Sequence, residues 1–397
     1  MSDIDLSARA IDATNRGLAT YIKFLSANDT GLTGAHQSGI LLSIKACPMI
    51  FGELPSEHIA KRDGIRIGWQ DDISTESTFT WYASKKELRL TRLGRGFPYL
   101  RPDFTGSLFV FNQMNDDMSE FEAYILESDR EIESYLTAFG LGPQDAGRMF
   151  RSSAGIEPEV AEESAIFDYV STLGDGINLE FPLSDVISKK ARDIQRAVYN
   201  HNELLRRDPD FKLVDFVRVE YSIFRAIEAR AYGPTISRGF EDVESFVNLA
   251  NTVLNRRKSR AGKSLEHHLE AIFDANKLTY EPQAKTEGNK KPDFIFPSGR
   301  EYHDPSYPIE RIIVLAAKTT CKDRWRQILN EADRNRGRTH FLVTLQQGNT
   351  PAQLKEMQEE NVQLIVPKAY IKAYPPEFRG DIWSLKQFLD HARSVLD

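Results

Sequence analysis

Two residues able to do chemistry stand at the ends of short apolar runs in the last third of the chain. Asp293 comes directly before the run Phe294–Phe296, and Lys318 comes directly after the run Ile312–Ala317. Short apolar runs closed by turn residues such as Pro297 predict buried strands, and a strand that is apolar throughout is typical of a sheet covered on both faces. We therefore expect a carboxylate and a cation at strand ends, where α/β sheets commonly place their chemistry.

A helix predicted for residues 322 to 334 brings a third candidate toward the same strand ends. Its apolar residues recur at the i, i+3, i+4, i+7 spacing of an amphipathic helix. Glu331 lies beside that apolar stripe, about 60° from Ile328 at 100° per residue. If the stripe packs on the sheet, Glu331 can lean toward Asp293 and Lys318. The stripe consists of Trp325, Ile328, Leu329 and Ala332.

Two carboxylates and one lysine form the set that metal-assisted phosphodiester hydrolysis requires. Asp293 and Glu331 offer the hard oxygen ligands that Mg²⁺ prefers, and such an ion also contacts the scissile phosphate. Lys318 could orient or deprotonate the attacking water and offset charge in the transition state. The same three residues could equally be ordinary charged groups at strand and helix ends, and their pattern alone does not separate the two interpretations.

The arrangement resembles the PD-(D/E)xK nuclease superfamily, with one departure. Ala316 stands two residues before Lys318, where that superfamily usually has an acid, and Glu331 on the following helix takes its place. At greater length the chain resembles the EcoRII-type restriction endonucleases. Blocks similar to their catalytic domain are RRKSRAGKSLEHHLEAIF, EGNKKPDFIFPS, YHD and KTTCKDRWRQILNEAD, and blocks similar to their effector domain are YIKFLSANDTGLTGAHQSG and LTRLGRG.

The chain is expected to contain two domains. Residues 1 to 145 contain β-type runs such as TFTWYAS and GSLFVFNQ between turn residues, and the resemblance implies that they form a mostly β pseudobarrel that binds DNA. Residues 146 to 173, with Ser-Ser-Ala-Gly and the acidic stretch EPEVAEES, are the predicted linker. Residues 174 to 397 change to helices and then to alternating strands and helices, which predicts an α/β domain. The resemblance makes this a PD-(D/E)xK restriction-endonuclease-like catalytic domain.

The resemblance also implies roles around the expected metal. Asp293 and Glu331 correspond to acidic site residues of the family, Lys318 to its catalytic lysine, and Tyr302 to a further active-site residue. Glu266 is an additional candidate Mg²⁺ ligand, because in the superfamily an acid from this helix often joins the metal site. From the residues alone, Tyr302 could be a surface tyrosine near a turn and Glu266 a solvated glutamate.

Basic residues near this site are candidates for DNA contact. In related enzymes arginines just after the lysine read CC…GG sites, which implies that role for Arg324 and Arg326, with phosphate contact or a solvated helix face as the alternative. Arg218 and Tyr221 fall at the family's pocket for flipped bases, with core packing as the alternative for Tyr221. A denser basic cluster is expected to position phosphates and contains Arg256, Arg257, Lys258, Arg260 and Lys263.

The first domain carries its own candidate DNA contacts. His36, Glu87 and Arg89 match DNA-contacting positions of the family's effector domain, whereas Lys85 replaces an arginine and Leu41 replaces a tyrosine. These departures leave the specificity of the effector site open, and a solvated charged strand is the alternative. The full set of candidates for effector DNA is His36, Lys85, Glu87, Arg89, Arg92 and Arg95.

Composition bounds the class of protein. The 397 residues are 41% hydrophobic with no apolar run of membrane length, and the acidic, polar N-terminus is not that of a signal peptide. Two cysteines are too few for a disulfide framework or a zinc cage and fit a reducing cytoplasm. The net charge of −7 hides a basic segment, because residues 251 to 340 contain 18 Lys and Arg against 12 Asp and Glu. This asymmetry favours one defined docking face for DNA.

The predicted function is that of an Mg²⁺-dependent type II restriction endonuclease acting on double-stranded DNA. The resemblance implies a CCWGG-type site cut before the first cytosine, stimulation by a second site bound at the effector domain, and occlusion of the catalytic cleft until that site is bound. A homodimer is expected because cutting both strands of a palindrome calls for two-fold symmetry. A cognate cytosine methyltransferase is expected as a partner in the system without physical contact. The alternatives are a repair or mobile-element nuclease with little sequence preference and a non-cutting DNA-binding regulator.

Overall fold

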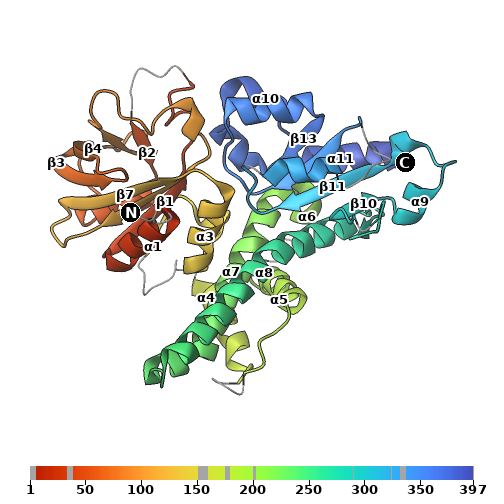
Figure 1. Ribbon diagram of the computed structural model, residues 1–397, viewed down its shortest axis with the longest axis horizontal. Coiled ribbons are helices and arrows are strands. Elements are labelled where there is room, and N and C mark those ends of the chain that lie inside the picture. The colour runs from red at the N-terminus through yellow and green to blue at the C-terminus, as the bar shows by residue number, and fades with distance from the viewer. Residues whose placement is uncertain are drawn as a thin grey trace.

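The computed structural model describes residues 6–33, 39–150, 160–174, 179–199, 203–288, 290–322, 324–330 and 337–396. One sheet forms the N-terminal part, a layer of long helices follows, and a second sheet lies in the C-terminal part (Figure 1). Within the described ranges, no helix is both long enough and apolar enough to cross a membrane. His36 and Glu331 lie outside the described residues.

The described part of the first domain contains an eight-stranded sheet that curls into a nearly closed barrel. Its order is β2-β5-β4-β3-β7-β6-β1-β8, with β3 and β7 parallel and the other neighbours antiparallel. The two edges approach each other, because Ser43 Oγ after β2 donates to the carbonyl oxygen of Gly147 before β8 at 2.6 Å. The mostly β pseudobarrel predicted for this domain is therefore confirmed. Its elements are α1 (Leu6–Arg16), β1 (Ala19–Phe24), β2 (Ile40–Leu42), α2 (Cys47–Phe51), β3 (Ile59–Trp69), β4 (Ser74–Tyr82), β5 (Glu87–Thr91), β6 (Leu108–Gln113), β7 (Glu120–Leu126), α3 (Asp129–Phe139) and β8 (Arg148–Phe150).

Helix α3 is fixed firmly to the outside of this sheet. It begins with a capping box in which the Ser128 side chain accepts from the Glu131 backbone and the Glu131 side chain accepts from the Ser128 backbone. Its apolar side, including Ile132 and Tyr135, is buried against β1, β6 and β7. Gly140 ends the helix in the left-handed conformation, at φ 61°, which is the common C-terminal stop. The opposite side of α3 faces the second domain.

A layer of helices joins the two sheets. Asp208 and Asp242 cap α7 and α8, because each side chain accepts a hydrogen bond from a backbone N–H of the first turn. The predicted linker, residues 146 to 173, is divided between the domains: β8 pairs with β1, whereas α4 packs on α5 and α7. The helices are α4 (Val160–Ser171), α5 (Ser184–Tyr199), α6 (Leu204–Arg207), α7 (Pro209–Arg238) and α8 (Val243–Ala275).

The described part of the second domain contains a five-stranded mixed sheet in the order β13-β12-β11-β10-β9. β11, β12 and β13 are parallel, and β10 runs antiparallel to both β11 and β9. One face is covered by α8 and α11 through a cluster that includes Phe273 and Phe388, and the other face carries Trp325 and Leu342. Burial on both faces explains why β11 is apolar from Ile313 to Ala317. The elements are β9 (Glu281–Pro282), β10 (Phe294–Phe296), α9 (Gly299–His303), β11 (Ile313–Lys318), β12 (His340–Thr344), α10 (Pro351–Glu359), β13 (Val362–Ile365) and α11 (Leu385–Leu396).

The segment after β11 differs from the prediction. The sequence pattern predicts an α-helix for residues 322 to 334, but Arg324–Asn330 forms a 3-10 helix, η6. Trp325 and Ile328 are both buried, and their spacing of three residues equals one turn of a 3-10 helix. An apolar pair at i and i+3 fits both kinds of helix, so the pattern could not separate them. The predicted α-helix is therefore wrong over residues 324 to 330, and Glu331 lies outside the described residues.

Candidate functional site

Asp293 and Lys318 meet at the edge of the second sheet. β10 pairs with β11 so that Phe294 lies opposite Leu315, which places the residue before β10 beside the end of β11. Asp293 Oδ2 accepts hydrogen bonds from the backbone N–H of Ala317 at 2.7 Å and from Lys318 Nζ at 3.1 Å. Asp293 is buried, so these donors stabilise a carboxylate that water scarcely reaches.

Glu266 brings a second carboxylate to the same place from α8. Gln283, directly after β9, connects the two acids: its Nε2 donates to Glu266 Oε2 and to Asp293 Oδ1, each at 3.1 Å. Burial raises the pKa of Glu266 above its ordinary value, and the nearby Asp293 raises it further, while Gln283 and Lys318 act in the opposite direction. Sequence reasoning placed Glu266 near the metal site, and the structure brings it into the same cluster as Asp293 and Lys318.

The cluster fits a divalent cation by the chemistry of its donors. Carboxylate oxygens are the ligands that Mg²⁺ selects, and the shared contact with Gln283 shows that both acids converge on one point. Asp293 Oδ2 accepts from two donors and Oδ1 from one, the Gln283 amide. Among the described residues no group of three His, Cys, Asp or Glu side chains converges on one metal position. Glu331, the further expected ligand, lies outside those residues.

Helix α3 of the first domain forms one wall of the cleft in front of this cluster. The cleft is about 240 Å³ and is lined on one side by Glu266, Lys318 and Arg324, and on the other by Glu133 and Thr137 of α3. Side chains of both domains therefore line the same space in front of Lys318. In Figure 1, α3 lies between the first sheet and the junction of α7 and α8.

Acids of α3 bind the segment that follows the lysine. The Asp129 carboxylate accepts the backbone N–H of Lys322 at 2.8 Å to each oxygen and the backbone N–H of Arg324 at 3.0 Å. Glu133 pairs with the Arg324 guanidinium at 3.1 Å. Lys322 is itself buried, and its Nζ donates to Ser107 Oγ of the first domain at 2.7 Å. We call this set, Asp129 and Glu133 on Lys322 and Arg324, the α3 latch.

Further polar contacts join the domains around the α3 latch. The backbones meet closely at Gly106 and Gly348, where a Cβ on Gly106 would lie 2.0 Å from the Gly348 oxygen. Most of the remaining contacts run from side chains to carbonyl oxygens, which makes the interface polar and suited to opening. Four side chains donate to backbone carbonyl oxygens across the interface: Arg225 to Gly140 at 3.2 Å, Arg257 to Thr137 at 3.0 Å, Gln346 to Gly106 at 3.0 Å and Gln347 to Pro143 at 2.8 Å. The backbone N–H of Ala27 also donates to the Ala373 carbonyl oxygen at 2.9 Å.

Tyr302 is a buried residue of α9. Its hydroxyl donates to Glu287 Oε1 at 2.6 Å, and its ring packs with Ile295 of β10 and Val314 of β11. The alternative of a surface tyrosine is therefore wrong, because the ring is only 1% exposed. Its catalytic role remains a prediction.

The predicted basic cluster of α8 is spread around the helix. Lys258 lines the cleft, and Arg257 pairs with Glu228 besides binding the first domain. Arg256 stacks on Phe181 at 4.5 Å from the ring centroid, beside the exposed Lys263. Arg260 is buried. Successive residues of a helix point in different directions, and so the five do not form one phosphate-binding face in this structure.

The Arg218 and Tyr221 pair is directed into the protein. Arg218 makes a two-pronged pair with the buried Glu162 of α4, at 2.7 and 2.8 Å. Tyr221 is 1% exposed and lies under the guanidinium of Arg260, at 3.5 Å from its ring centroid. In this structure the cation on the tyrosine ring is therefore Arg260, a contact between two helices that the sequence pattern could not reveal. A base-binding role for the pair remains a prediction.

The arginine that follows Arg324 along η6 has different surroundings. Arg326 stacks on Trp325 at 4.7 Å and pairs with Glu356 of α10 on the exposed surface. Arg324 instead faces the cleft and the first domain. The two candidates for base reading therefore point to different sides of η6, and their contact with DNA remains a prediction.

Candidate effector residues lie on the outer side of β5 and the loop after it. Burial alternates along β5, with Leu88 and Leu90 in the core and Glu87 and Arg89 outside, where they pair at 3.7 Å. β2 runs beside β5 so that Leu41 lies opposite Arg89. Lys85 is exposed in the turn before β5. The loop after β5 surrounds a hollow of about 670 Å³ lined by Arg92, Leu93, Gly94, Arg95, Gly96, Phe97 and Leu100.

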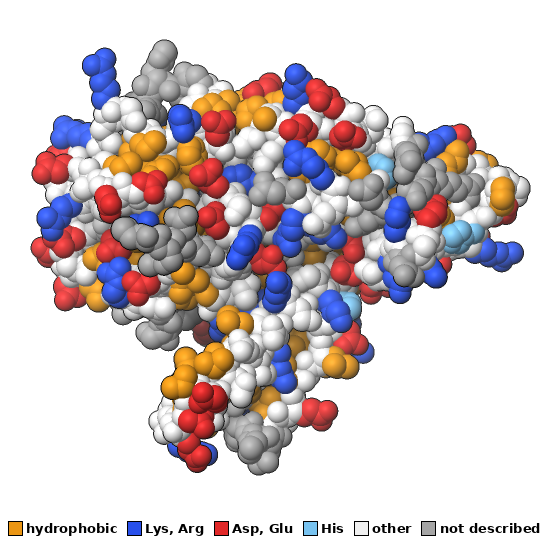
Figure 2. Space-filling view, in the orientation of Figure 1, with side chains coloured by type: hydrophobic (Ala, Val, Ile, Leu, Met, Phe, Trp, Pro, Cys, Tyr) orange, Lys and Arg blue, Asp and Glu red, His pale blue; other side chains and the backbone are white. Residues whose placement is uncertain are grey.

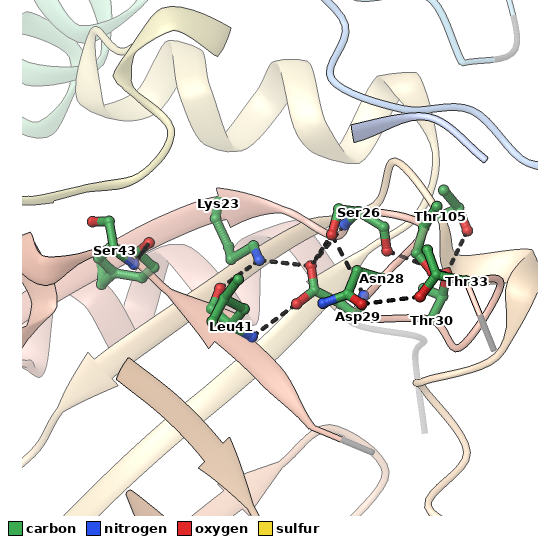
Figure 3. A network of polar contacts seen from close by, with 11 residues as sticks. Lys23, Ser26, Asn28, Asp29, Thr30, Thr33, Leu41, Ser43 and Thr105 are labelled. Carbon is green, nitrogen blue, oxygen red and sulfur yellow. Dashed lines mark hydrogen bonds and ion pairs between the residues drawn. The ribbon is translucent and has the colours of Figure 1, made fainter. Parts of the chain in front are cut away.

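Asp29 fixes both ends of the segment that contains His36. Its side chain accepts from Lys23 Nζ at 2.6 Å, from the Ser26 hydroxyl at 2.7 Å, and from the backbone N–H of Leu41 at 2.8 Å (Figure 3). Lys23 Nζ also donates to the Leu41 carbonyl at 2.6 Å. These bonds tie the end of β1 to the start of β2, on either side of residues 34 to 38.

The second domain therefore has the architecture of the PD-(D/E)xK nuclease class, with an acid and a lysine on adjacent strands and another acid from the covering helix. Two family models match the chain: "Restriction endonuclease EcoRII, N-terminal" matches residues 14–144 and "EcoRII C terminal" matches residues 224–389. The type II restriction enzyme EcoRII of Escherichia coli is 38% identical over 388 residues, which cover 93% of this chain and 92% of that protein. The chain belongs to the EcoRII family of type II restriction endonucleases.

Two solved structures are similar to the chain over a little more than half its length. Metal-depleted Ecl18kI in complex with uncleaved, modified DNA has a TM-score of 0.46 and 16% identity, covering 59% of this chain and 83% of that one. A PspGI–substrate DNA complex has a TM-score of 0.45 and 19% identity, covering 54% of this chain and 93% of that one.

Membership of the family settles the general activity. The chain is a site-specific nuclease that binds double-stranded DNA. Restriction endonucleases depend on a divalent metal in general, and the carboxylates of Asp293 and Glu266 offer suitable ligands.

Proposed function

We propose that the chain hydrolyses double-stranded DNA at a CCWGG-like site, before the first cytosine, with Mg²⁺ as cofactor. The observation that supports this most is the contact of Asp293 with Lys318 at 3.1 Å beside Glu266, on the cleft side of the second sheet. The sequence and cut position come from the resemblance to the EcoRII family. A cytosine methyltransferase protecting the same site in the cytoplasm would complete the system.

Each residue of the cluster has a distinct task in this proposal. Asp293 and Glu266, with Glu331, hold the ion, which when bound polarises the scissile phosphate. Lys318 lies within hydrogen-bond distance of Asp293, so its ammonium group can orient the attacking water and offset negative charge on the phosphate. Tyr302 packs against Ile295 and Val314 and so supports the β10–β11 edge. Arg324 and Arg326 contact the DNA once the cleft opens.

The first domain is proposed to inhibit the second until it binds another copy of the site. The α3 latch supports this, because Lys318 and Arg324 share a cleft with side chains of α3, and Glu133 of α3 pairs with Arg324. Asp129 holds two backbone N–H groups and Glu133 a guanidinium, which are donors of the kind that bind DNA phosphates. DNA and α3 therefore compete for the same segment.

Removal of the first domain tests whether that domain inhibits cleavage by the second. The predicted linker ends at residue 173, but a cut there would remove α4, which packs on α5 and α7 and whose Glu162 neutralises Arg218. We therefore expect a chain beginning at residue 160 to cleave single-site DNA faster than the full chain, whereas one beginning at residue 172 loses Glu162 and is less stable. Slower cleavage of single-site DNA by the longer fragment, at unchanged thermal stability, would reject inhibition.

A homodimer is proposed through the exposed half of α8. Val243, Phe246, Val247 and Leu254 are 42% to 70% exposed and lie on one side of the helix. This part of α8 projects from the body of the molecule (Figure 1), and hydrophobic side chains gather at its tip (Figure 2). A second copy is the occupant we propose, since a palindromic site calls for two catalytic domains related by two-fold symmetry.

Sedimentation velocity tests the dimer. Phe246→Glu places a charge in the apolar face and is expected to convert the dimer to a monomer, while Leu54→Glu, at an exposed apolar residue of the first domain, leaves it unchanged. A Phe246→Glu chain that sediments as the unchanged chain does would exclude this surface as the interface.

A plasmid digest tests the proposed activity against its alternatives. With Mg²⁺ and a plasmid that contains several CCWGG sites, we expect discrete fragments whose ends map before the first cytosine, and no cleavage with EDTA. A smear would indicate a nuclease without sequence preference. Intact plasmid at every Mg²⁺ concentration, with DNA still bound, would indicate a non-cutting regulator.

A further inference from the structure

Gln283 has a contact pattern that an exposed glutamine rarely has. It follows the short strand β9, and its backbone N–H donates to the Asp293 carbonyl oxygen at 3.1 Å. Its side-chain amide reaches two different carboxylates, Glu266 from α8 and Asp293 from the start of β10, at 3.1 Å each. Three chain segments that are separate in sequence are therefore joined through this one residue.

The orientation of the amide follows from the partners. Ionised carboxylates can only accept hydrogen bonds, so the group between Glu266 and Asp293 must be the NH₂, which has two N–H donors. The neutral amide donates one N–H to each carboxylate, so both acids have a hydrogen-bond donor. Without it, two carboxylates that share a small volume would repel each other.

The backbone of Gln283 also adopts a conformation that is unfavourable for most residues. Its φ is 51°, in the left-handed region that residues other than glycine, asparagine and aspartate seldom adopt. A solvated surface glutamine has no need of that conformation. Here it turns the side chain toward the carboxylates while the backbone N–H stays bound to Asp293.

We infer that Gln283 is a positioning residue of the metal site: its amide holds together Glu266 and Asp293, the two acids that would bind the divalent cation. This rests on the proposed metal-dependent hydrolysis. The two N–H groups lie where positive charge is needed and keep the acids converged before the ion enters. Donors around metal ligands commonly change metal affinity by about 10- to 100-fold when removed.

Two substitutions separate this role from the backbone conformation. Gln283→Ala removes the amide. Gln283→Asn keeps an amide and suits the left-handed backbone, but it is one methylene shorter and cannot span both carboxylates. A role in the turn alone would make the asparagine variant behave as the unchanged protein, whereas a role in bridging the acids makes it behave as the alanine variant.

Mn²⁺ titration of the full-length chain without DNA, followed by electron paramagnetic resonance of the free ion, tests the inference. We expect both variants to bind Mn²⁺ about tenfold more weakly, with thermal stability measured in EDTA as a check on folding. The control Gln358→Ala, which removes an amide donated to Asp381 on the surface, should leave Mn²⁺ affinity unchanged.

A parallel Asp293→Asn titration distinguishes the possible failures. If Asp293→Asn abolishes Mn²⁺ binding but Gln283→Asn binds as tightly as the unchanged protein, the positioning role is wrong and the proposed site stands. If Asp293→Asn also leaves Mn²⁺ binding unchanged, the proposed metal site itself is wrong.

Discussion

The two domains present their DNA-facing residues in opposite ways. In the first domain Glu87 and Arg89 lie on the outer side of β5, beside the exposed Arg92 and Arg95. In the second domain Lys318 and its neighbours line a cleft that α3 walls off. Arg92 and Arg95 are thus exposed, whereas Lys318 shares its cleft with side chains of α3.

The partners of the basic residues account for this difference. Arg89 and Arg92 pair with Glu87 and Asp63 of their own domain, so DNA binding there breaks no contact between domains. Arg324 instead pairs with Glu133 across the interface, and its backbone N–H is held by Asp129. The structure therefore supports an order of events in which effector DNA binds first.

The largest effect is expected from a substitution in the cleft of the second domain. Lys318→Ala removes the cation beside Asp293 and should lower the cleavage rate by at least about 10³-fold, since general acid–base and electrostatic contributions are both lost. DNA binding at the effector domain should persist, as measured by footprinting. The control Lys355→Ala, at an exposed lysine of α10, should cleave normally. Cleavage within tenfold of the unchanged rate would remove Lys318 from the chemistry.

The second prediction concerns a substitution in the first domain. The Asp29 side chain is fully buried and paired with Lys23, so Asp29→Asn leaves that lysine without its charge partner. We expect a loss of about 3 to 5 kcal/mol in the stability of the first domain and weaker binding of effector DNA. Calorimetry and gel-shift titration measure the two effects. Unchanged DNA affinity despite lower stability would show that Asp29 does not position the effector surface.

A smaller effect is expected at the effector surface itself. Arg89→Ala should weaken binding of effector DNA by about 1 to 3 kcal/mol, the usual range for one base-reading contact. Cleavage of two-site DNA should lose its stimulation, while single-site cleavage stays at its low level. Equal loss of affinity for every DNA sequence would instead identify Arg89 as a phosphate contact.

The sequence predicts local features of this molecule better than contacts between distant segments. The apolar runs predict β10 and β11 and thereby bring Asp293 next to Lys318, because strand ends are fixed by short-range pattern. No sequence motif pointed to Gln283, because its proposed role depends on a turn that places it between α8 and β10. Sequence reasoning treated Arg324 as a DNA contact or as part of a solvated helix face, because its partner Glu133 lies in another domain.

The central claim is that the second domain is inhibited by the α3 latch, and Asp129→Asn in the full-length chain tests it most directly. The loss of charge-assisted bonds to Lys322 and Arg324 should weaken the closed state by about 2 to 3 kcal/mol, or about 30- to 150-fold. We predict that single-site DNA is cleaved at least about tenfold faster, with two-site cleavage little changed, while Asp12→Asn on the exposed face of α1 has no effect. Single-site cleavage no faster than that of the unchanged chain, in a folded Asp129→Asn protein, would contradict the account.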